Sequence, residues 1–282
     1  MHDAPPPPSE ARRLVIVAYF DQRPLRPLLD LLASMERHPA GCPYERLVVV
    51  STTGTDRLDR LRSAGIPCLE RQSLGLNIGA WDDGWRQAAD VDEFLFLQDD
   101  CLVVRQNWLR AFADACGPGV GLVGESLNEH WDRPWDELRR TRGKIRVAEH
   151  QLAGRRANRV DVYLEFMARH GIEPGEAGRH LRGQVWFARR AALASIDGFP
   201  KGRNRGEHIA SEIAVSRAME AKGWCVRQVA ETPFHYISHR EWEHSNADGA
   251  FRHAQSVGRL ERLRRQWRQV RSSGGGPSRS TS

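Results

Sequence analysis

The stretch FLFLQDDCLVV (Phe94–Val104) joins a short apolar run to two adjacent acids. Four apolar residues bounded by polar ones are typical of a strand that is buried on both faces. Asp99 and Asp100 follow this strand directly, and because an unpaired carboxylate is costly to bury, we expect both to face a solvent-filled site. Paired carboxylates there suit a hard divalent cation, Mg²⁺ or Mn²⁺. The alternative is a plain turn, because Asp is common where strands end.

Strand and helix patterns alternate along the chain before this stretch. Short apolar runs predict strands at Leu14–Tyr19, Leu47–Val50 and Ile66–Glu70. Helical spacing predicts helices at Pro24–Glu36, Asp56–Ala64 and Ala80–Ala89. Strands that alternate with helices are joined by right-handed crossovers and covered on both faces. The sequence therefore predicts an α/β fold, a Rossmann-like three-layer α/β/α domain with a mostly parallel central sheet.

The second half of the chain has a more mixed pattern. It begins with a basic stretch that we expect to be irregular, Trp131–Asn158. Helices are predicted at Val160–His170 and His208–Lys222, and strands at Gln184–Ala188 and Cys225–Glu231. We divide the chain into a Pro-rich tail (1–10), two halves of one domain (11–125 and 126–245), a basic helix (246–271) and a flexible tail (272–282).

Composition limits the classes of protein to which the chain can belong. The five cysteines form no C-x-x-C pair, and no apolar run approaches the roughly 18 residues that cross a bilayer. The N-terminus lacks the layout of a signal peptide, so we expect a reduced, cytoplasmic protein. The net charge of +6 is concentrated in Arg139–Arg159 and Arg252–Arg271. Because no aromatic-basic motif accompanies these blocks, nucleic-acid binding is not expected.

The segment Phe251–Val270 predicts a helix with a narrow apolar stripe beside a cationic face. One hypothesis is that it docks on an anionic membrane surface. We favour packing on the domain or on a second copy, because the stripe is thin and Glu261 interrupts the positive charge.

Ligands of parallel sheets bind at the carboxyl ends of the strands. This rule directs attention to Tyr19–Arg23, Ser51–Thr55, Leu74–Gly79 and Gln98–Cys101. Within the third of these ranges, Asn77 and Gly79 are the residue types of a plain turn that caps the following helix, and a role in a binding site is the alternative.

The acid-pair stretch resembles the acidic metal motif of GT-A glycosyltransferases, and the resemblance includes the Asn107-Trp108-Leu109 that follows it. Most of the chain resembles glycosyltransferase family 2. Leu14–Asp21 and Val48–Asp56 are similar to the two strand–loop units that cradle the nucleotide base in that family. Arg182–Pro200 is similar to its donor-side glycine loop. The resemblance implies that residues 11–125 bind a nucleotide-sugar donor (a UDP-, GDP- or dTDP-sugar). It implies that residues 126–245 bind a carbohydrate or small-molecule acceptor and carry the catalytic group.

The resemblance also implies individual donor-site residues, namely Tyr19, Asp21, Ser51, Asn77, Gly79, Gln98, Asp99 and Trp186. Gln98 stands where the family has an acid, so it brings hydrogen-bonding capacity without charge. Trp186 lies in a predicted strand, where it either stacks on a sugar or packs in the core.

Further positions correspond to the reacting groups of the family. Asp100, the last acid, is the implied direct ligand of Mn²⁺ or Mg²⁺, and either His235 or His239, with His239 preferred, is a further ligand. Glu212, which follows Ser211 at a predicted helix start, matches the acid that serves as general base in inverting members. Glu207 is the alternative base, and plain capping is the alternative role of Glu212.

The predicted function is therefore that of a metal-dependent, inverting glycosyltransferase. A nucleotidyltransferase of similar fold would need a glycine-rich basic loop after its first strand, which Tyr19–Arg23 is not. A non-catalytic sugar-nucleotide-binding relative is the other alternative, and Gln98 is the residue that favours it.

Overall fold

The central sheet has seven strands in the order β10-β6-β9-β4-β1-β2-β3. The computed structural model describes residues 11–72, 75–146, 156–240, 242–243 and 252–253. The strands of this sheet are β1 (Arg13–Phe20), β2 (Glu45–Ser51), β3 (Cys68–Arg71), β4 (Glu93–Gln98), β6 (Val120–Gly124), β9 (Val185–Arg189) and β10 (Cys225–Gln228). Strand β9 is antiparallel to β4 and β6, whereas the pairs β1–β2, β1–β4, β2–β3 and β6–β10 are parallel. The prediction of a mostly parallel sheet is confirmed.

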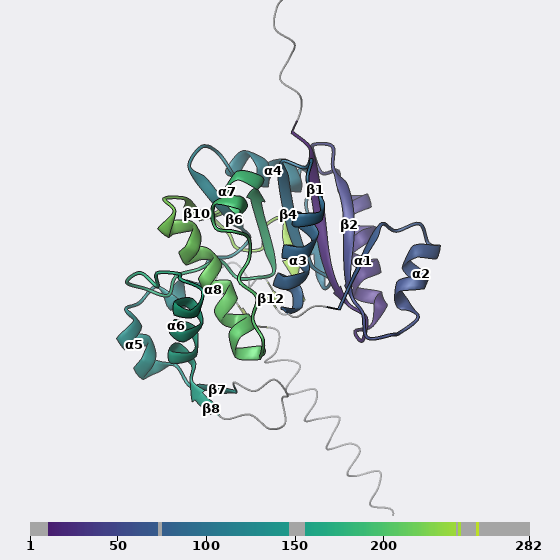
Figure 1. Cartoon of the computed structure of the whole chain (residues 1–282). Coiled ribbons are helices and arrows are strands. Elements are labelled where there is room, and N and C mark those ends of the chain that lie inside the picture. The colour runs from purple at the N-terminus through teal and green to yellow at the C-terminus, as the bar shows by residue number, and fades with distance from the viewer. Residues whose placement is uncertain (1–10, 73–74, 147–155, 241, 244–251, 254–282) are drawn as a thin grey trace, which may run out of the picture.

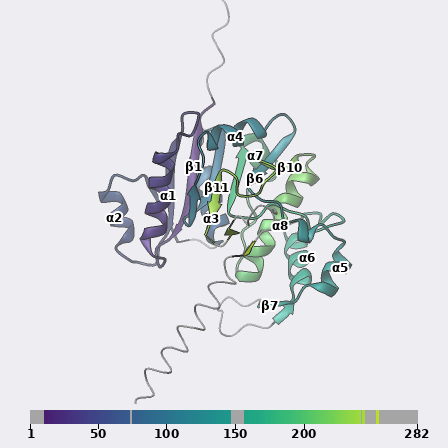
Figure 2. The ribbon, with the colours of Figure 1, turned by 180° about the vertical axis from the view of Figure 1, so that it is seen from behind.

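Strand β1 shows why an apolar run lies at the centre of the sheet. Val15 and Val17 belong to the core on one face, and Leu14 and Ile16 to the core on the other. The first core is covered by α1 (Leu25–Arg37), α2 (Arg57–Ser63) and α4 (Trp108–Ala115), and the second by α3 (Leu76–Gln87), α7 (Arg190–Ser195) and α8 (Arg205–Ala221). Helix α3 lies in front of the sheet in Figure 1, and α1 comes forward when the molecule is seen from behind in Figure 2. The predicted three layers are confirmed.

A second sheet lies beside the end of the acid-pair stretch. It has the order β13-β12-β11-β5, formed by β5 (Cys101–Val103), β11 (Ile237–His239), β12 (Trp242–Glu243) and β13 (Arg252–His253). Strand β11 is antiparallel to β5 and pairs His239 with Cys101. This pairing brings the C-terminal part of the described chain next to Asp99 and Asp100.

The stretch that we expected to be irregular contains regular structure, so that expectation is wrong. It includes the 3₁₀ turn η1 (Glu129–Trp131), helix α5 (Trp135–Thr141) and the paired strands β7 (Lys144–Arg146) and β8 (Arg156–Asn158). Helix α6 (Arg159–Arg169) follows and packs with α5 and α8 around a third apolar cluster, which contains Tyr163, Phe166 and Ile213. Figure 1 shows α5 and α6 beside α8, away from β1 and β2.

The basic helix predicted at Phe251–Val270 lies outside the described residues except for Arg252 and His253, and so do both predicted tails. No helix in the part of the chain that the structure describes is long and apolar enough to cross a membrane.

Candidate active site

A cleft of ≈ 420 Å³ opens at the carboxyl ends of β1, β2, β3 and β4. This is the edge at which ligands of open α/β sheets bind. Five of the predicted donor residues line the cleft, namely Tyr19, Ser51, Asn77, Gln98 and Asp99. Arg23 and Arg71 also line it and give it a cationic side.

The backbone N–H and carbonyl groups of Gly183 contact three of the predicted site residues. Its carbonyl oxygen accepts hydrogen bonds from Asn77 Nδ2 at 3.1 Å and from Gln98 Nε2 at 2.5 Å. Its N–H donates to Glu212 Oε2 at 3.1 Å. Because Asn77 and Gln98 line the cleft while Glu212 belongs to α8, the backbone of this one residue connects the cleft wall to the candidate base.

Gln98 connects the Gly183 peptide to His239. Since its Nε2 donates to the Gly183 carbonyl, its Oε1 must face His239, whose Nε2 lies 3.2 Å away. The same ring nitrogen lies 2.9 Å from Asp100 Oδ1. A nitrogen between two acceptors must carry a proton, so His239 acts here as a hydrogen-bond donor. An acid in place of Gln98 could accept from His239 but, when ionised, could not donate to Gly183.

Arg23 bridges the two acids. Its Nη1 lies 2.8 Å from Asp99 Oδ1 and its Nη2 lies 2.6 Å from Asp100 Oδ2. The side chains of Asp99 and Asp100 are only 3% and 8% exposed, against 45% for Arg23. Buried carboxylates are retained where cationic groups pair with them, and the two acids of this site are paired in that way.

The two acids differ in their protonation behaviour. Burial, aided by the charge of Asp100 and opposed by Arg23, raises the pKa of Asp99 to about 6. Burial also acts to raise the pKa of Asp100, but its contacts with His239 and Arg23 outweigh burial and lower that pKa well below its usual range. Asp100 therefore carries the more firmly held negative charge of the pair.

The acid pair has the chemistry of a cation site. Asp99 Oδ2 is buried and has no hydrogen-bond partner among the described groups, which is what a carboxylate oxygen kept for a cation would show. However, within the described ranges no group of three or more His, Cys, Asp and Glu side chains is arranged to hold a metal ion. The two carboxylates are of the ligand type that a divalent cation prefers, and His239 lies beside them, but in this structure Arg23 supplies the positive charge that pairs with them.

Asp21 and Tyr19 organise the loops around the cleft. Asp21 is fully buried, and its carboxylate accepts from the N–H and hydroxyl groups of Thr53 and Thr55 at 2.8–3.2 Å. Burial acts to raise the pKa of Asp21, but these hydrogen bonds lower it overall. Tyr19 Oη donates to the Arg23 carbonyl at 2.8 Å. We predicted that Asp21 binds the donor. In the structure its carboxylate already holds the loops after β1 and β2 together through these hydrogen bonds.

The start of α8 differs from the prediction. The helix begins at Arg205, so the expectations that Ser211 caps it and that Glu212 stands at its N-terminus are wrong. Asn204 is the N-cap and accepts from Glu207 N at 3.1 Å, while Glu207 Oε2 accepts from Arg203 N at 2.7 Å. This pattern is similar to a capping box, except that the Glu207 carboxylate accepts from the residue before the N-cap. Glu207, the alternative base, is also only 2.9 Å from Arg169 and is therefore engaged in capping and ion pairing.

Trp186 lies in the core behind the cleft. Its ring is fully buried, 5.3 Å from the ring of Trp81 and 5.6 Å from that of Phe199, centroid to centroid. The stacking role predicted for Trp186 does not fit this position, because neither face of its ring is open to a sugar. The alternative, packing in the core, describes where it lies.

Gly79 and Asn77 lie inside the first turn of α3 and not in a turn ahead of it, which corrects the prediction. The chain turns at Gly75, whose φ is 107°. A Cβ at Gly75 would come within 2.9 Å of the Gly79 Cα, so two glycines allow this turn to close against the helix.

Of the two candidate histidines, the structure places His239 at the acid pair. His235 lies in the preceding loop, where its N–H donates to Glu125 at 2.7 Å. The buried Glu125 carboxylate also accepts from the N–H groups of Tyr236 and Ile237, at 3.0 and 2.7 Å. Glu125 thereby anchors the segment that leads to β11 and positions His239.

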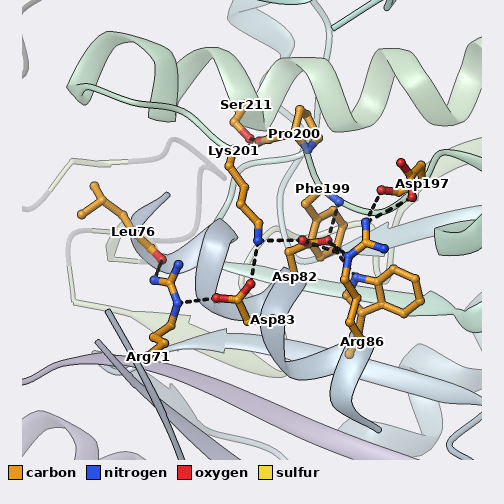
Figure 3. Close-up of polar contacts among 11 residues, drawn as sticks. Arg71, Leu76, Asp82, Asp83, Arg86, Asp197, Phe199, Pro200, Lys201 and Ser211 are labelled. Carbon is orange, nitrogen blue, oxygen red and sulfur yellow. Dashed lines mark hydrogen bonds and ion pairs between the residues drawn. The ribbon is translucent and has the colours of Figure 1, made fainter. Parts of the chain in front are cut away.

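A ladder of alternating charges fixes the cationic side of the cleft (Figure 3). Arg71 Nε lies 2.7 Å from Asp83 Oδ2, and Lys201 Nζ bridges Asp83 at 2.6 Å and Asp82 at 3.0 Å. Arg71 also reaches Ser51 Oγ, at 2.9 Å. The ladder connects the ends of β2 and β3 to the loop before α8, so that loop and the cleft wall are held together.

Three residues of the site were missed in the sequence, namely Arg23, Arg71 and Gly183. Arg23 and Gly183 lie in stretches that the sequence had singled out, but no individual role was predicted for either residue. Arg71 is the last residue of β3, one position beyond the predicted end of that strand. A basic residue at the carboxyl end of a parallel strand was the available signal for Arg23 and Arg71.

Comparison with known proteins gives matches among solved structures. No family model and no curated protein matches the chain. The chain is similar to the mannosyltransferase PcManGT from Pyrobaculum calidifontis, solved with GDP-Man and Mn²⁺, at a TM-score of 0.49 and 17% identity over 80% of this chain and 57% of that one. It is similar to GalNAc-T7, solved with UDP, GalNAc and Mn²⁺, at a TM-score of 0.49 and 11% identity over 81% of this chain and 43% of that one.

A third match is the glucosyl-3-phosphoglycerate synthase from Mycobacterium tuberculosis, solved with phosphoglyceric acid, with a TM-score of 0.43 and 15% identity over 82% of this chain and 72% of that one. The matched proteins are glycosyltransferases, which is the class that the sequence resemblance predicted. The chain spans about half the length of the first two. These identities and TM-scores are too low to assign a reaction to the chain, so its function has to be argued from the residues of the site.

Proposed function

We propose that the chain is a glycosyltransferase that moves a sugar from a nucleotide-sugar donor to an acceptor hydroxyl, with inversion at the anomeric carbon. One observation carries this proposal. The backbone N–H and carbonyl groups of Gly183, together with Gln98, link Glu212 to His239, and thus to the acid pair, beside one cleft. A candidate base and a cation-binding pair belong to one hydrogen-bonded unit, as a transfer between a diphosphate donor and a hydroxyl acceptor would require.

The donor would lie in the cleft at the strand ends. Tyr19, Ser51 and Asn77 offer hydrogen-bonding groups there, and Arg23 and Arg71 offer positive charge for a diphosphate. A UDP-, GDP- or dTDP-sugar meets these requirements, and the acceptor is a carbohydrate or another small molecule with a free hydroxyl.

In the proposed reaction, the acceptor oxygen attacks the anomeric carbon while the bond between that carbon and the diphosphate oxygen breaks. The proton of the acceptor passes to the Glu212 carboxylate, and the diphosphate leaves with the electron pair. Positioned bases of this kind typically contribute about 10²–10⁴ in rate. Asp99 and Asp100, with His239 adjacent, would hold Mn²⁺ or Mg²⁺, and such a cation supplies positive charge beside the leaving diphosphate when bound.

The test is a panel of UDP-, GDP- and dTDP-sugars with and without Mn²⁺, read first as a thermal shift and then as release of nucleoside diphosphate. A donor that binds the native state raises its melting temperature. We expect one nucleotide class to raise it, and to be consumed in the presence of an acceptor. If no sugar nucleotide shifts the melting temperature at millimolar concentration, the proposal is wrong.

A second candidate is a non-catalytic sugar-nucleotide-binding protein, favoured by the observation that Arg23 occupies both acids. Such a protein would show the thermal shift but neither transfer nor donor hydrolysis. The same panel therefore separates the two candidates.

A further inference from the structure

Arg23 contacts both acids of the site, each through a separate nitrogen. We propose that Arg23 is a displaceable internal counter-ion, which pairs with Asp99 and Asp100 in the ligand-free protein and releases them to a divalent cation. Once released, its guanidinium binds the diphosphate of the donor. The exchange with the cation stands on the geometry of the three side chains, and only the last step rests on the proposed function.

The backbone of Arg23 is fixed while its side chain is accessible. Its N–H donates to the Phe20 carbonyl at 2.9 Å, and its own carbonyl accepts from Tyr19 Oη at 2.8 Å and from Arg57. Its side chain is 45% exposed and lines the cleft. The head group can therefore leave the acids by rotation of the side chain, without any rearrangement of the loop.

The balance of charge favours the exchange. The two carboxylates carry two negative charges when ionised, and the guanidinium of Arg23 carries a single positive charge. Asp99 Oδ2 is buried without a hydrogen-bond partner among the described groups, and Asp100 Oδ1 has only the His239 ring nitrogen beside it. A divalent cation would neutralise both carboxylates and use Asp99 Oδ2. The displaced guanidinium has the fork of donors that suits a phosphate group, and it already lies on the cleft side of the pair.

The exchange can be measured with Mn²⁺ alone, by following free Mn²⁺ in a titration by electron paramagnetic resonance. Arg23→Gln should bind Mn²⁺ about tenfold more tightly than the wild type, or more, because the competing charge is gone. Arg26→Gln is the matched control, since Arg26 lies in the same segment, is 82% exposed and pairs with Asp30. It should bind Mn²⁺ like the wild type. Asp100→Asn should lose binding. Unchanged or weaker Mn²⁺ binding by Arg23→Gln would overturn the proposal.

Thermal melting gives a second readout, because Arg23→Gln leaves two buried acids without their cation. We expect its melting temperature to fall without metal and to be restored by Mn²⁺, with a larger metal-induced rise than in the wild type. Arg23→Lys keeps the charge but not the fork, so it should lie between the two. If Mn²⁺ raises the melting temperatures of all three proteins equally, Arg23 does not compete with the cation.

Nucleoside diphosphates then test the last step. With Mn²⁺ saturating, Arg23→Gln should bind UDP, GDP or dTDP more weakly than the wild type, although it binds Mn²⁺ more tightly. The two proposals can fail separately. If Arg23→Gln binds Mn²⁺ tightly but the wild type transfers sugar from no donor, the counter-ion proposal is supported and the proposed function is refuted. Transfer by the wild type combined with unchanged Mn²⁺ binding by Arg23→Gln would do the reverse.

Discussion

Glu212 lies in van der Waals and hydrogen-bond contact with Gly183. The backbone N–H of Gly183 donates to Glu212 Oε2 at 3.1 Å, and a Cβ at Gly183 would stand 2.8 Å from the Cδ of Glu212. Only a residue without a side chain allows the carboxylate to approach this peptide so closely. The position of the candidate base is therefore set by a glycine in a different part of the chain.

Gly183→Ala should therefore impair transfer by displacing the Glu212 carboxylate. The added methyl group meets the end of a flexible side chain, so we expect the fold to adapt and the carboxylate to move. A displacement of about 1 Å can cost about 10²-fold in rate. The prediction is checked by kcat, donor affinity and melting temperature. Gly117→Ala is the control, because a Cβ there meets nothing within 4 Å. Equal kcat in both variants would contradict the role given to Gly183.

Glu212 and Glu207 should fail in different ways when they are changed to glutamine. Glu212→Gln keeps the shape of the side chain but cannot take the proton, so we expect transfer to fall by about 10²–10⁴ with donor binding retained. Glu207→Gln should keep its activity and lose about 1–3 kcal/mol of unfolding free energy, because it weakens the contacts with Arg169 and Arg203.

Steady-state kinetics and urea unfolding of both variants check this pair of predictions. The opposite pattern, an inactive Glu207→Gln and a fully active Glu212→Gln, would move the catalytic role to the first turn of α8. It would also contradict the capping role that the contacts of Glu207 describe.

Gln98→Glu tests whether the amide is needed as a donor. An ionised carboxylate at this position would face the Gly183 carbonyl, which Gln98 Nε2 now meets at 2.5 Å, without a proton to give. An unmade buried hydrogen bond costs about 1–3 kcal/mol, and we expect a loss of unfolding free energy in that range. Gln72→Glu adds the same charge at an exposed position and is the control. Equal stability of the two variants would show that the link from Gln98 to Gly183 contributes nothing.

The sheet could be predicted because its central strands are buried on both faces. Leu14–Phe20 and Phe94–Leu97 must be apolar throughout, and that pattern survives in the sequence. Strand β6 (Val120–Gly124) was missed because two of its five residues are glycines, which usually indicate turns. Gly121 is required there, since a Cβ would come within 2.6 Å of Trp224. A tertiary contact thus overrode the local pattern.

The members of the site could be predicted only where a residue type carries its own chemistry. Asp99 and Asp100 were singled out by their charge and position and His239 by the family resemblance, and the structure brings the three side chains together. Arg23 and Gly183 act through partners that are distant in the sequence, so their roles depend on the fold. The stacking role predicted for Trp186 was wrong for the same reason, because nothing in its local sequence shows which of its neighbours will cover the ring.

Glu125 should make the stability of the protein depend on pH. Burial is the largest effect on its carboxyl group and raises the pKa to about 7 from its ordinary value of 4.5, against the lowering effect of three backbone N–H donors. When the folded pKa lies above the unfolded one, the stabilising contribution is complete below the unfolded pKa and is lost as the pH rises through the folded pKa. The contribution of Glu125 is therefore complete below about pH 4.5 and is lost as the pH rises from about 4.5 to about 7, with a total on the order of 3 kcal/mol.

Urea unfolding of the wild type and of Glu125→Gln at pH 5 and pH 8 isolates this contribution. The amide does not titrate, so the other ionisable groups cancel in the difference between the two proteins. We expect the wild type to lose stability relative to Glu125→Gln as the pH is raised, by up to about 3 kcal/mol. At pH 5 the variant should be the less stable protein, because an amide nitrogen cannot accept from the N–H groups that the carboxylate now binds. Glu36→Gln, at an exposed position, controls for the removal of a carboxyl group. A pH-independent difference between the wild type and Glu125→Gln would mean that Glu125 remains ionised throughout this range, held by its three N–H donors.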